Sequence, residues 1–411
     1  MTVIAPARDL TIRIAQSLGD VAAARWDACA NPPAEALDSK LEGLDSLSQG
    51  ERFNPFITHA FLSACETSKS TGGRTGWGPV HILVEDAEKS LLACAPAYLK
   101  SHSQGEYVFD HGWAEALERA GGRYYPKLQI AVPFTPAPGR RLLVAPGPRE
   151  AEARATLIAA ARALQDKAGA SSVHATFLPK AEWDVLGEAG FLQRTGEQFH
   201  FLNEGYATFN TFLAALSSRK RKMIKRERAE AVAPGIEIER LTGAAITEGH
   251  WDAFFEFYIE TGSRKWGRPY LTRAFFSAVG ASMAERILLV MAKRGGRYIA
   301  GAINFIGDDA LYGRNWGAIE HHPFLHFELC YYQAIDFAIM HGLKRVEAGA
   351  QGEHKLARGY RPVPTYSAHS FADPRMTRAI QDYLVRERRA VAQSIEIYGG
   401  HVPFKQTDGQ T

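Results

Sequence analysis

The sequence predicts an α/β fold built from two units with the same order of elements. Three observations lead to this prediction. At 411 residues, the chain is long enough to form two domains that each bury a hydrophobic core. The predicted helices and strands alternate along the chain instead of forming separate blocks. Each half repeats the order hairpin, helix, strand, although no residue-level repeat accompanies it.

In the first half, a loop-rich lead-in over residues 31–53 precedes the regular elements. Two strand patterns flank the charged turn at 86–89 and so predict a hairpin. Residues 101–149 are rich in Pro, Gly and aromatic residues, and they predict an irregular insertion. The elements expected in this half are a helix at 55–67, a glycine-rich connector at 72–79, strands at 80–85 and 90–100, a helix at 150–167, a strand at 172–177, a helix at 181–188 and a strand at 198–202.

The second half follows the same order, with a hairpin that turns at Arg294-Gly-Gly-Arg297. The elements expected here are helices at 209–230 and 250–260, strands at 287–292, 298–306 and 310–316, a helix at 326–341 and a strand at 343–348. The predicted division is a first domain over 1–202 with its insertion near 101–149, a second domain over 203–375, and a C-terminal helix and tail over 376–411.

The helix predicted at 326–341 is apolar nearly all round, with a single polar row formed by Glu328, Tyr332 and Asp336. Such a helix is expected to be buried. Glu328 lies in its first turn, where the helix dipole favours an acid. A stabilising charge and a functional carboxylate are both open interpretations of this residue.

Composition excludes several classes of protein. Of the residues, 46% are apolar and 23% are charged, and the net charge of +3 is too small to indicate nucleic-acid binding by itself. The four cysteines form no C-x-x-C pair, which argues against a disulfide scaffold or a zinc module. Neither a leader pattern nor a long apolar run is present in the sequence. A soluble, cytoplasmic protein is expected.

A polar loop follows the last predicted strand, over Gly349-Ala-Gln-Gly-Glu-His-Lys-Leu-Ala-Arg-Gly-Tyr360. Its glycines allow the backbone to approach a ligand closely, and the end of a strand is where α/β proteins place their chemistry. A solvated turn is the alternative interpretation. The loop brings together an amide, an acid, an imidazole and two cations, from Gln351, Glu353, His354, Lys355 and Arg358.

The most basic stretch of the chain is residues 219–228, with seven cations and one acid. Continued from Leu213 as a helix, it places Leu213, Leu216, Met223 and Ile224 on one face. We call the opposite face, formed by Arg221, Lys222, Lys225 and Arg228, the basic ridge. Cations at this density repel one another unless an anion approaches, so the ridge predicts a site for phosphate groups. A solvated helix face is the alternative.

Other signals are weaker. Arg74-Thr-Gly-Trp-Gly78 precedes a strand, so it is interpreted as a connector and not as a phosphate loop. His321, His322 and His326 lack a matching pattern of zinc ligands, and no metal site is expected. The aromatic and cationic segment Tyr124-Tyr-Pro-Lys-Leu128 is predicted either to line a ligand groove or to pack in the core.

Several of these segments together resemble the GNAT-like, FemAB-related proteins, specifically the bacterial group labelled peptidoglycan biosynthesis or recognition proteins or GNAT-family N-acetyltransferases. The resemblance covers roughly residues 50–375, and the loop from Gly349 to Tyr360 is its most specific part. The other segments that carry it are Val108-Phe-Asp-His-Gly-Trp113, residues 123–134, the basic helix, residues 296–305, Leu311-Tyr-Gly-Arg-Asn-Trp-Gly-Ala318 and residues 325–335.

The resemblance implies two tandem GNAT-like units that face each other. It also implies that Lys355 and Arg358-Gly-Tyr360 belong to a loop that contacts substrate phosphate and the reacting carbonyl. The pyrophosphate signature of GNAT enzymes is absent before the helix at 326–341. This departure leaves the donor open between an acyl-CoA and an aminoacyl-tRNA.

The resulting hypothesis is transfer of an acyl or aminoacyl group to an amine of a small molecule, peptide or cell-wall precursor. Such a reaction needs a base for the amine proton and a donor that stabilises the oxyanion. Glu353 or His354 is the expected base, with Glu347 and Glu328 as further candidates, and Lys355 serves the oxyanion or a phosphate. The expected substrate-binding residues are Gln351, Arg358, Tyr360, Arg314, Lys127, Arg221, Lys222, Lys225 and Arg228. A GNAT-like binding protein without catalytic activity, which recognises a peptidoglycan-related or other anionic ligand, is the alternative.

Overall fold

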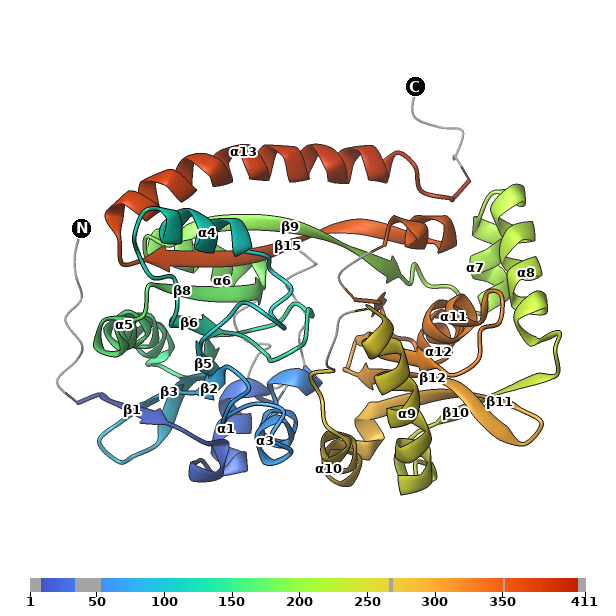
Figure 1. The fold of residues 1–411 in the computed structure, drawn as a ribbon, viewed down its shortest axis with the longest axis horizontal. Helices are drawn as coiled ribbons and strands as arrows, with labels where there is room; N and C mark the ends of the chain where they lie inside the picture. The colour runs from blue at the N-terminus through green and yellow to red at the C-terminus, as the bar shows by residue number, and fades with distance from the viewer. Residues whose placement is uncertain (1–8, 34–52, 266–268, 350–351, 406–411) are drawn as a thin grey trace. The chain divides into compact units, whose positions relative to one another are not determined.

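The computed structural model describes residues 9–33, 53–265, 269–349 and 352–405 of the chain (Figure 1). Two compact units are present. The first comprises Met1–Gly196 and Thr365–Ala390, and the second comprises Glu197–Pro364 and Val391–Thr411. The sequence-based division assigns residues 365–390 to the second domain and the tail, whereas the structure assigns them to the first unit.

The first unit contains a small antiparallel sheet in the order β1-β3-β4-β7. Tryptophan and cysteine side chains of α1 are buried beside it, and α5 contacts β3 and β4. The elements are β1 (Thr11–Ala15), α1 (Ala23–Ala30), α3 (His59–Thr67), β3 (His81–Glu85), β4 (Leu91–Ala95), β7 (Leu143–Val144) and α5 (Glu150–Ala168). The hairpin and the helix predicted at 150–167 are therefore confirmed.

A second group of strands in the first unit has the order β15-β8-β6-β5-β2. Strands β6 and β8 are parallel, and the other pairs for which a register is known are antiparallel. The elements are β2 (Trp77–Pro79), β5 (Ala97–Lys100), α4 (His111–Arg119), β6 (Lys127–Ile130), β8 (Ser172–Leu178), α6 (Lys180–Glu188), β15 (Tyr360–Phe371) and α13 (Pro374–Gly399). Strand β15 and helix α13 each continue into the second unit.

The two faces of this strand group differ in chemistry although both are buried. One face packs Leu128, Ile130 and Val173 into the apolar core shared with α5. Successive strand residues point to opposite faces, so the residues between these form the other face. That face is polar and buried: Lys100, Lys127, Gln129, Ser172, His174, Thr176, Ser367 and His369.

Among the described residues of the second unit, strands lie in the order β10-β11-β12-β13-β14-β9. In this group β13 and β14 are parallel, and the other pairs are antiparallel. The elements are β9 (Leu192–Leu202), α7 (Phe209–Ala215), α8 (Ser218–Val232), β10 (Ile236–Leu241), α9 (Glu248–Lys265), α10 (Arg273–Met283), β11 (Ile287–Arg294), β12 (Arg297–Ile306), β13 (Ala310–Ala318), α11 (Leu325–Phe327), a π-helical turn (Glu328–Tyr332), α12 (Gln333–Met340) and β14 (Arg345–Glu347). The α/β class predicted from the sequence is confirmed.

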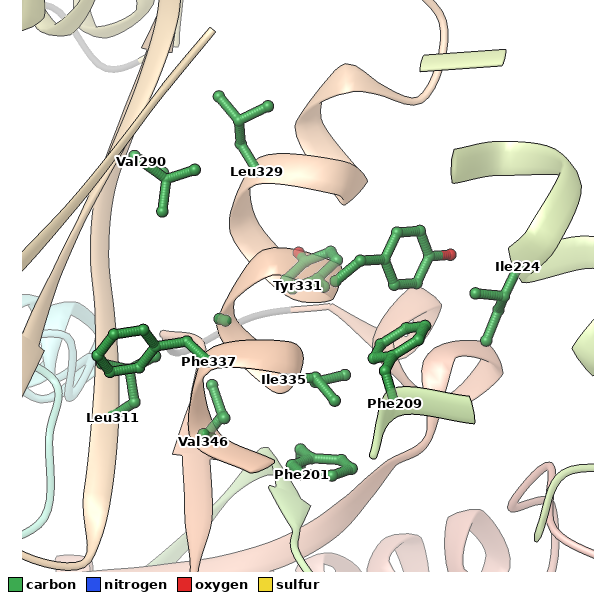
Figure 2. Close-up of a cluster of buried hydrophobic side chains, with 14 of the residues drawn as sticks. Phe201, Phe209, Ile224, Val290, Leu311, Leu329, Tyr331, Ile335, Phe337 and Val346 are labelled. Carbon is green, nitrogen blue, oxygen red and sulfur yellow. The ribbon is translucent and has the colours of Figure 1, made fainter. Parts of the chain in front are cut away.

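The main core of the second unit lies between these strands and the helices α7, α8 and α12. Figure 2 shows Phe337 of α12 with Leu311 and Val346, and Phe209 of α7 with Ile335 and Ile224. Helix α9 packs on the other face of β12 and β13, so close to Gly317 that an added Cβ would lie 2.1 Å from the Phe257 carbonyl oxygen. The helix predicted at 326–341 is confirmed as a buried element. This element includes a π-helical turn, and Met340, the last residue of α12, is 65% exposed.

The helix predicted at 209–230 is two helices, because Leu216 adopts an extended conformation between them. Its backbone bridges to Phe404, and the Ser217 amide donates to the Pro403 carbonyl. The prediction of an irregular segment at 101–149 is wrong where α4, β6 and β7 form. In the part of the chain that the structure describes, no helix is both long and apolar enough to cross a membrane.

Candidate active site in the second unit

The parallel strands β13 and β14 separate shortly after they meet. Their register covers only Ala310–Tyr312 and Arg345–Glu347, although β13 continues to Ala318. At the same point β13 has a β-bulge against β12, where Arg314 is the extra residue between Gly313 and Asn315. Bulges often lie beside active sites because they interrupt regular pairing. The pairing of β13 with β14 therefore ends at Glu347, two residues before the loop that begins at Gly349.

Glu347 ends β14 and is buried. Its carboxylate accepts a hydrogen bond from Nε of Arg345 at 2.9 Å and lies 4.0 Å from Nε2 of His200. Arg345 is also bound to Asp309 at 2.8 Å. Burial, followed by the positive charges of Arg345 and Lys355, lowers the pKa of His200 to about 3, so this imidazole is neutral. Glu347 is thus placed in a buried network next to the loop.

The predicted polar loop contains a six-residue 3₁₀ helix, Glu353–Arg358, between Gly352 and Gly359. Both glycines have positive φ angles, of 124° and 90°, which disfavour a side chain. This turn points Lys355 inward, where the side chain is 1% exposed and its Nζ donates to the Gly349 carbonyl at 2.9 Å. Gln351 and the side chain of Glu353 lie outside the described part of the structure.

Lys355 is a buried cation with one acceptor. Among the side chains that the structure describes, none is a carboxylate that forms an ion pair with it. Burial lowers the pKa of Lys355 to about 8, because the ammonium form loses its hydration. One proton of the ammonium group is donated to Gly349. The other two can be donated to a ligand oxygen. Buried groups with a perturbed pKa are more frequent at functional sites than elsewhere, which makes Lys355 a candidate site residue.

Arg358 is held by the basic helix. Its Nη2 lies 2.9 and 3.0 Å from the two carboxylate oxygens of Glu227 in α8, and its Nη1 donates to the His354 carbonyl at 2.8 Å. The guanidinium also stacks 3.4 Å from the ring centre of Phe327. Tyr332 donates a further hydrogen bond to Glu227. Arg358 therefore ties the predicted loop to α8, and its charge is neutralised within the protein by Glu227.

His354 is exposed at the surface of the turn, with Nε2 2.8 Å from the hydroxyl of Tyr331. Aromatic side chains surround His354, and they come from the helical segment at 325–332 and from the start of β15. The ring of Tyr331 is 5.5 Å from that of Tyr360, and Phe327 is 5.8 Å from His354. The hydroxyl of Tyr360 is buried and has no hydrogen-bond partner among the described residues. The structure thus places His354, Lys355 and Arg358 in one turn, and Tyr360 at the start of the strand that follows it.

Glu328 and Arg228 face each other across the core. Glu328 is buried in the π-helical turn and accepts hydrogen bonds from Nε and Nη2 of Arg228 at 3.0 and 2.9 Å. Gln333 donates to the same carboxylate at 2.7 Å. Arg228 therefore leaves the solvent-facing side of α8, whereas Lys222 and Lys225 remain exposed there and Arg221 is half-buried.

We expect this difference to separate two variants of the basic ridge. Lys222→Ala combined with Lys225→Ala should leave the thermal midpoint unchanged, weaken donor binding and flatten its dependence on salt. Arg228→Ala should instead lower the free energy of unfolding by about 1–3 kcal/mol, because it leaves the buried Glu328 carboxylate short of donors. Thermal melts and binding titrations at two salt concentrations measure both effects. Equal stability losses in the two variants would contradict the expectation.

Lys127 and Arg314 are the two predicted binding residues that belong neither to the loop at 349–360 nor to the basic ridge. Lys127 belongs to the first unit, where its ammonium group is buried and bound to Ser103, Glu106 and Asp110. Arg314 is half-buried on the β-bulge of the second unit. Among the residues that the structure describes, no group of three or more His, Cys, Asp or Glu side chains is arranged to hold a metal ion.

The role of Glu227 was missed in the sequence analysis. It stands in a run of cations and has the appearance of one acid on a basic helix. Its position supplied a usable clue, because it lies three residues after Ile224 and four before Ala231, both buried. Helical periodicity therefore places Glu227 on the inward face.

Comparison with solved structures finds similar folds at low sequence identity. FemX matches with 12% identity and a TM-score of 0.49, over 78% of this chain and 93% of FemX. A tandem GNAT protein from the clavulanic acid biosynthesis pathway matches with 12% identity and a TM-score of 0.45, over 89% and 99% of the two chains. L-PGS from Bacillus licheniformis matches with 10% identity and a TM-score of 0.48, over 92% and 99%.

Among curated protein sequences, none matches this chain. The FemAB_like family, described as peptidoglycan biosynthesis/recognition, matches residues 17–406. This span covers both units and includes every residue of the candidate site. The chain therefore belongs to the FemAB-like family.

Proposed function

We propose that this protein is a transferase that moves an acyl or aminoacyl group from an activated donor to an amine of a peptidoglycan precursor. Family membership supports the link to peptidoglycan. The observation that carries the chemistry is Lys355: a buried ammonium group in the turn that follows β14, with two protons not engaged by the protein. Attack of an amine on a carbonyl develops negative charge on oxygen, and a preorganised donor in a water-poor site stabilises that charge.

The roles of the other residues follow from their partners. His354 is the proposed base for the amine proton, because it is exposed and its ring is oriented by Tyr331. Glu328 and Glu347 each already accept a hydrogen bond from an arginine within the protein, so neither is the proposed base. Glu353 remains a candidate base from the sequence. The amine nitrogen loses its proton to the base, its lone pair forms the new C–N bond, and the donor's leaving group departs.

The donor is proposed to carry phosphate, as an acyl-CoA or an aminoacyl-tRNA. Lys222 and Lys225 project from α8 into solvent, and the same helix holds Arg358 of the loop. A phosphate group bound on the outer side of α8 would therefore lie on the element that supports Lys355. The peptidoglycan precursor, with its own amine, is the proposed acceptor.

Transfer can be tested by incubating the protein with a nucleotide-linked peptidoglycan precursor and one donor at a time, either acyl-CoA or charged tRNA. Intact mass of the precursor reports transfer, and free CoA or deacylated tRNA reports donor use. Product with one donor supports the proposal and identifies the donor. Binding of the precursor without use of either donor would instead favour the recognition function that the family description also names.

A further inference from the structure

Glu227 is a buried acid whose side-chain contacts join two parts of the candidate site. It is 4% exposed, so its charge requires compensation inside the protein. Arg358 supplies that compensation with one nitrogen shared between both carboxylate oxygens, at 2.9 and 3.0 Å. Tyr332 donates to the same carboxylate. Burial, together with this hydrogen bond, raises the pKa of Tyr332, so its hydroxyl keeps the proton that it donates.

Arg358 and Tyr332, the two partners of Glu227, are each connected to a residue that the proposed reaction uses. Arg358 ends the turn that carries Lys355, and its Nη1 holds the His354 carbonyl at 2.8 Å. Tyr332 belongs to the π-helical turn, directly after Tyr331, which hydrogen bonds to the His354 ring at 2.8 Å. A displacement of the Glu227 carboxylate would therefore move the backbone of the turn and the support of the proposed base together.

Glu227 also balances the charge of Arg358, which lies three residues from Lys355 in the same turn. With Glu227 ionised, the Arg358–Glu227 pair is neutral, and Lys355 is the uncompensated cation of the described turn. Without Glu227, Arg358 becomes a second positive charge only three residues from Lys355. A like charge disfavours the ammonium form, so the pKa of Lys355 would fall further. Arg358 Nε is buried and has no hydrogen-bond partner among the described residues, which leaves one donor on this side chain for a ligand.

We infer that Glu227 is a positioning residue of the transferase site: it fixes Arg358 and Tyr332 so that Lys355 and His354 are held in their working geometry. The inference rests on the proposed function for its kinetic consequences. A misplacement of about 1 Å in such a site can cost roughly a hundredfold in rate. Glu227 touches none of the reacting atoms, and its effect passes through its two partners.

The test compares Glu227→Gln with Glu230→Gln, a matched change on the same helix. Glu230 is exposed and pairs with Arg226 at 3.2 Å, away from the site. Glu227→Gln should lower kcat about tenfold or more and leave KM for the acceptor within about threefold. It should also move the loss of kcat at high pH to lower pH, because the ammonium form of Lys355 is less stable. Glu230→Gln should match the parent in all three measurements.

A second substitution separates charge from geometry. In Glu227→Gln combined with Arg358→Gln, the unpaired arginine is gone, so the pH profile should return toward that of the parent while kcat stays low. If Glu227→Gln lowers only the melting temperature, and leaves kcat and the pH profile of the folded fraction unchanged, the role is structural and the inference is overturned.

Failure of the proposed function would be recognised separately, as a parent protein that consumes no donor. In that case the pKa of Lys355 can be followed by NMR on protein with labelled lysine side chains, using Lys355→Arg to assign the signal. A lower pKa in Glu227→Gln than in the parent, with no change in Glu230→Gln, would still support the positioning role. Equal values in all three proteins would overturn it.

Discussion

Lys355→Ala is expected to lower turnover about a hundredfold or more, since removing one donor to a developing oxyanion typically has an effect of this size. The fold should survive, because the side chain contributes one hydrogen bond, to the Gly349 carbonyl. Single-turnover rates with saturating donor and acceptor measure the effect on the chemical step. A variant that turns over like the parent would place the catalytic centre elsewhere and leave the turn as a scaffold.

The pH dependence gives Lys355 a distinct signature. Burial lowers its pKa to about 8 from the usual 10.5, and the ammonium form is the one that stabilises an oxyanion. The rate should therefore decline as pH rises through about 8. Lys355→Arg keeps a charge that does not titrate in this range, so the decline should disappear. Its activity should return only in part, because the planar guanidinium cannot reproduce the geometry of a point donor.

Burial of Lys355 should also make the folded protein less stable, although it serves the proposed reaction. In the folded chain the Lys355 pKa is depressed, so the buried cation costs free energy at neutral pH, and this cost falls as pH rises from about 8 toward 10.5. Lys355→Met should therefore raise the free energy of unfolding by about 1–3 kcal/mol near pH 7, with a smaller gain at pH 10. If Lys355 serves function, Lys355→Met should gain stability and lose turnover. If Lys355 serves only the fold, the same variant should lose stability and keep its turnover.

Periodicity predicted the long elements of the fold well, and tertiary contacts decided the others. Strand β15 was missed because Pro362 and Pro364 argue against a strand. Its register with β8 begins only at Tyr366, so the prolines lie outside that ladder. The break between α7 and α8 could not be predicted, because Leu216 forms its backbone bridge there with Phe404, nearly two hundred residues along the chain. Strand β6 reads as half-exposed since it carries Lys127 and Gln129, yet both are buried.

The candidate site was predictable where it is local in sequence. The loop after β14 was expected to carry His354, Lys355 and Arg358, and the structure places all three there. The partners of these residues were not predictable, because Glu227 and Tyr331 come from helices that packing alone brings to the loop. Arg228 was predicted to belong to the exposed ridge, because its partner Glu328 lies a hundred residues away along the chain and could not be foreseen.

The first unit contains the largest group of buried charges among the described residues, centred on Lys127. The pairs run from Lys100 to Glu106 at 3.6 Å and from Lys127 to Glu106 at 2.7 Å, and Lys127 also binds Asp110. Burial raises the pKa of Glu106, and the nearby Lys127 only partly offsets this. Burial also acts against the charge of Asp110, but Lys127 and hydrogen bonds outweigh it and lower the pKa of that carboxyl. Lys127 is therefore the common ion-pair partner of two buried acids.

Lys127→Met should lower the free energy of unfolding by about 3–5 kcal/mol at pH 7, because it leaves Glu106 and Asp110 buried without their common partner. Lys180→Met is the control: this exposed pair with Asp184 should be worth less than about 1 kcal/mol. In the Lys127 variant both acids have folded-state pKa values raised above their unfolded values, so they take up protons on folding. The stability loss should therefore shrink as pH falls toward about 5. Denaturant unfolding at pH 7 and pH 5 measures this difference. A loss that stays constant with pH would mean that packing of the lysine stem, and not the charge of its ammonium group, holds this part of the first unit together.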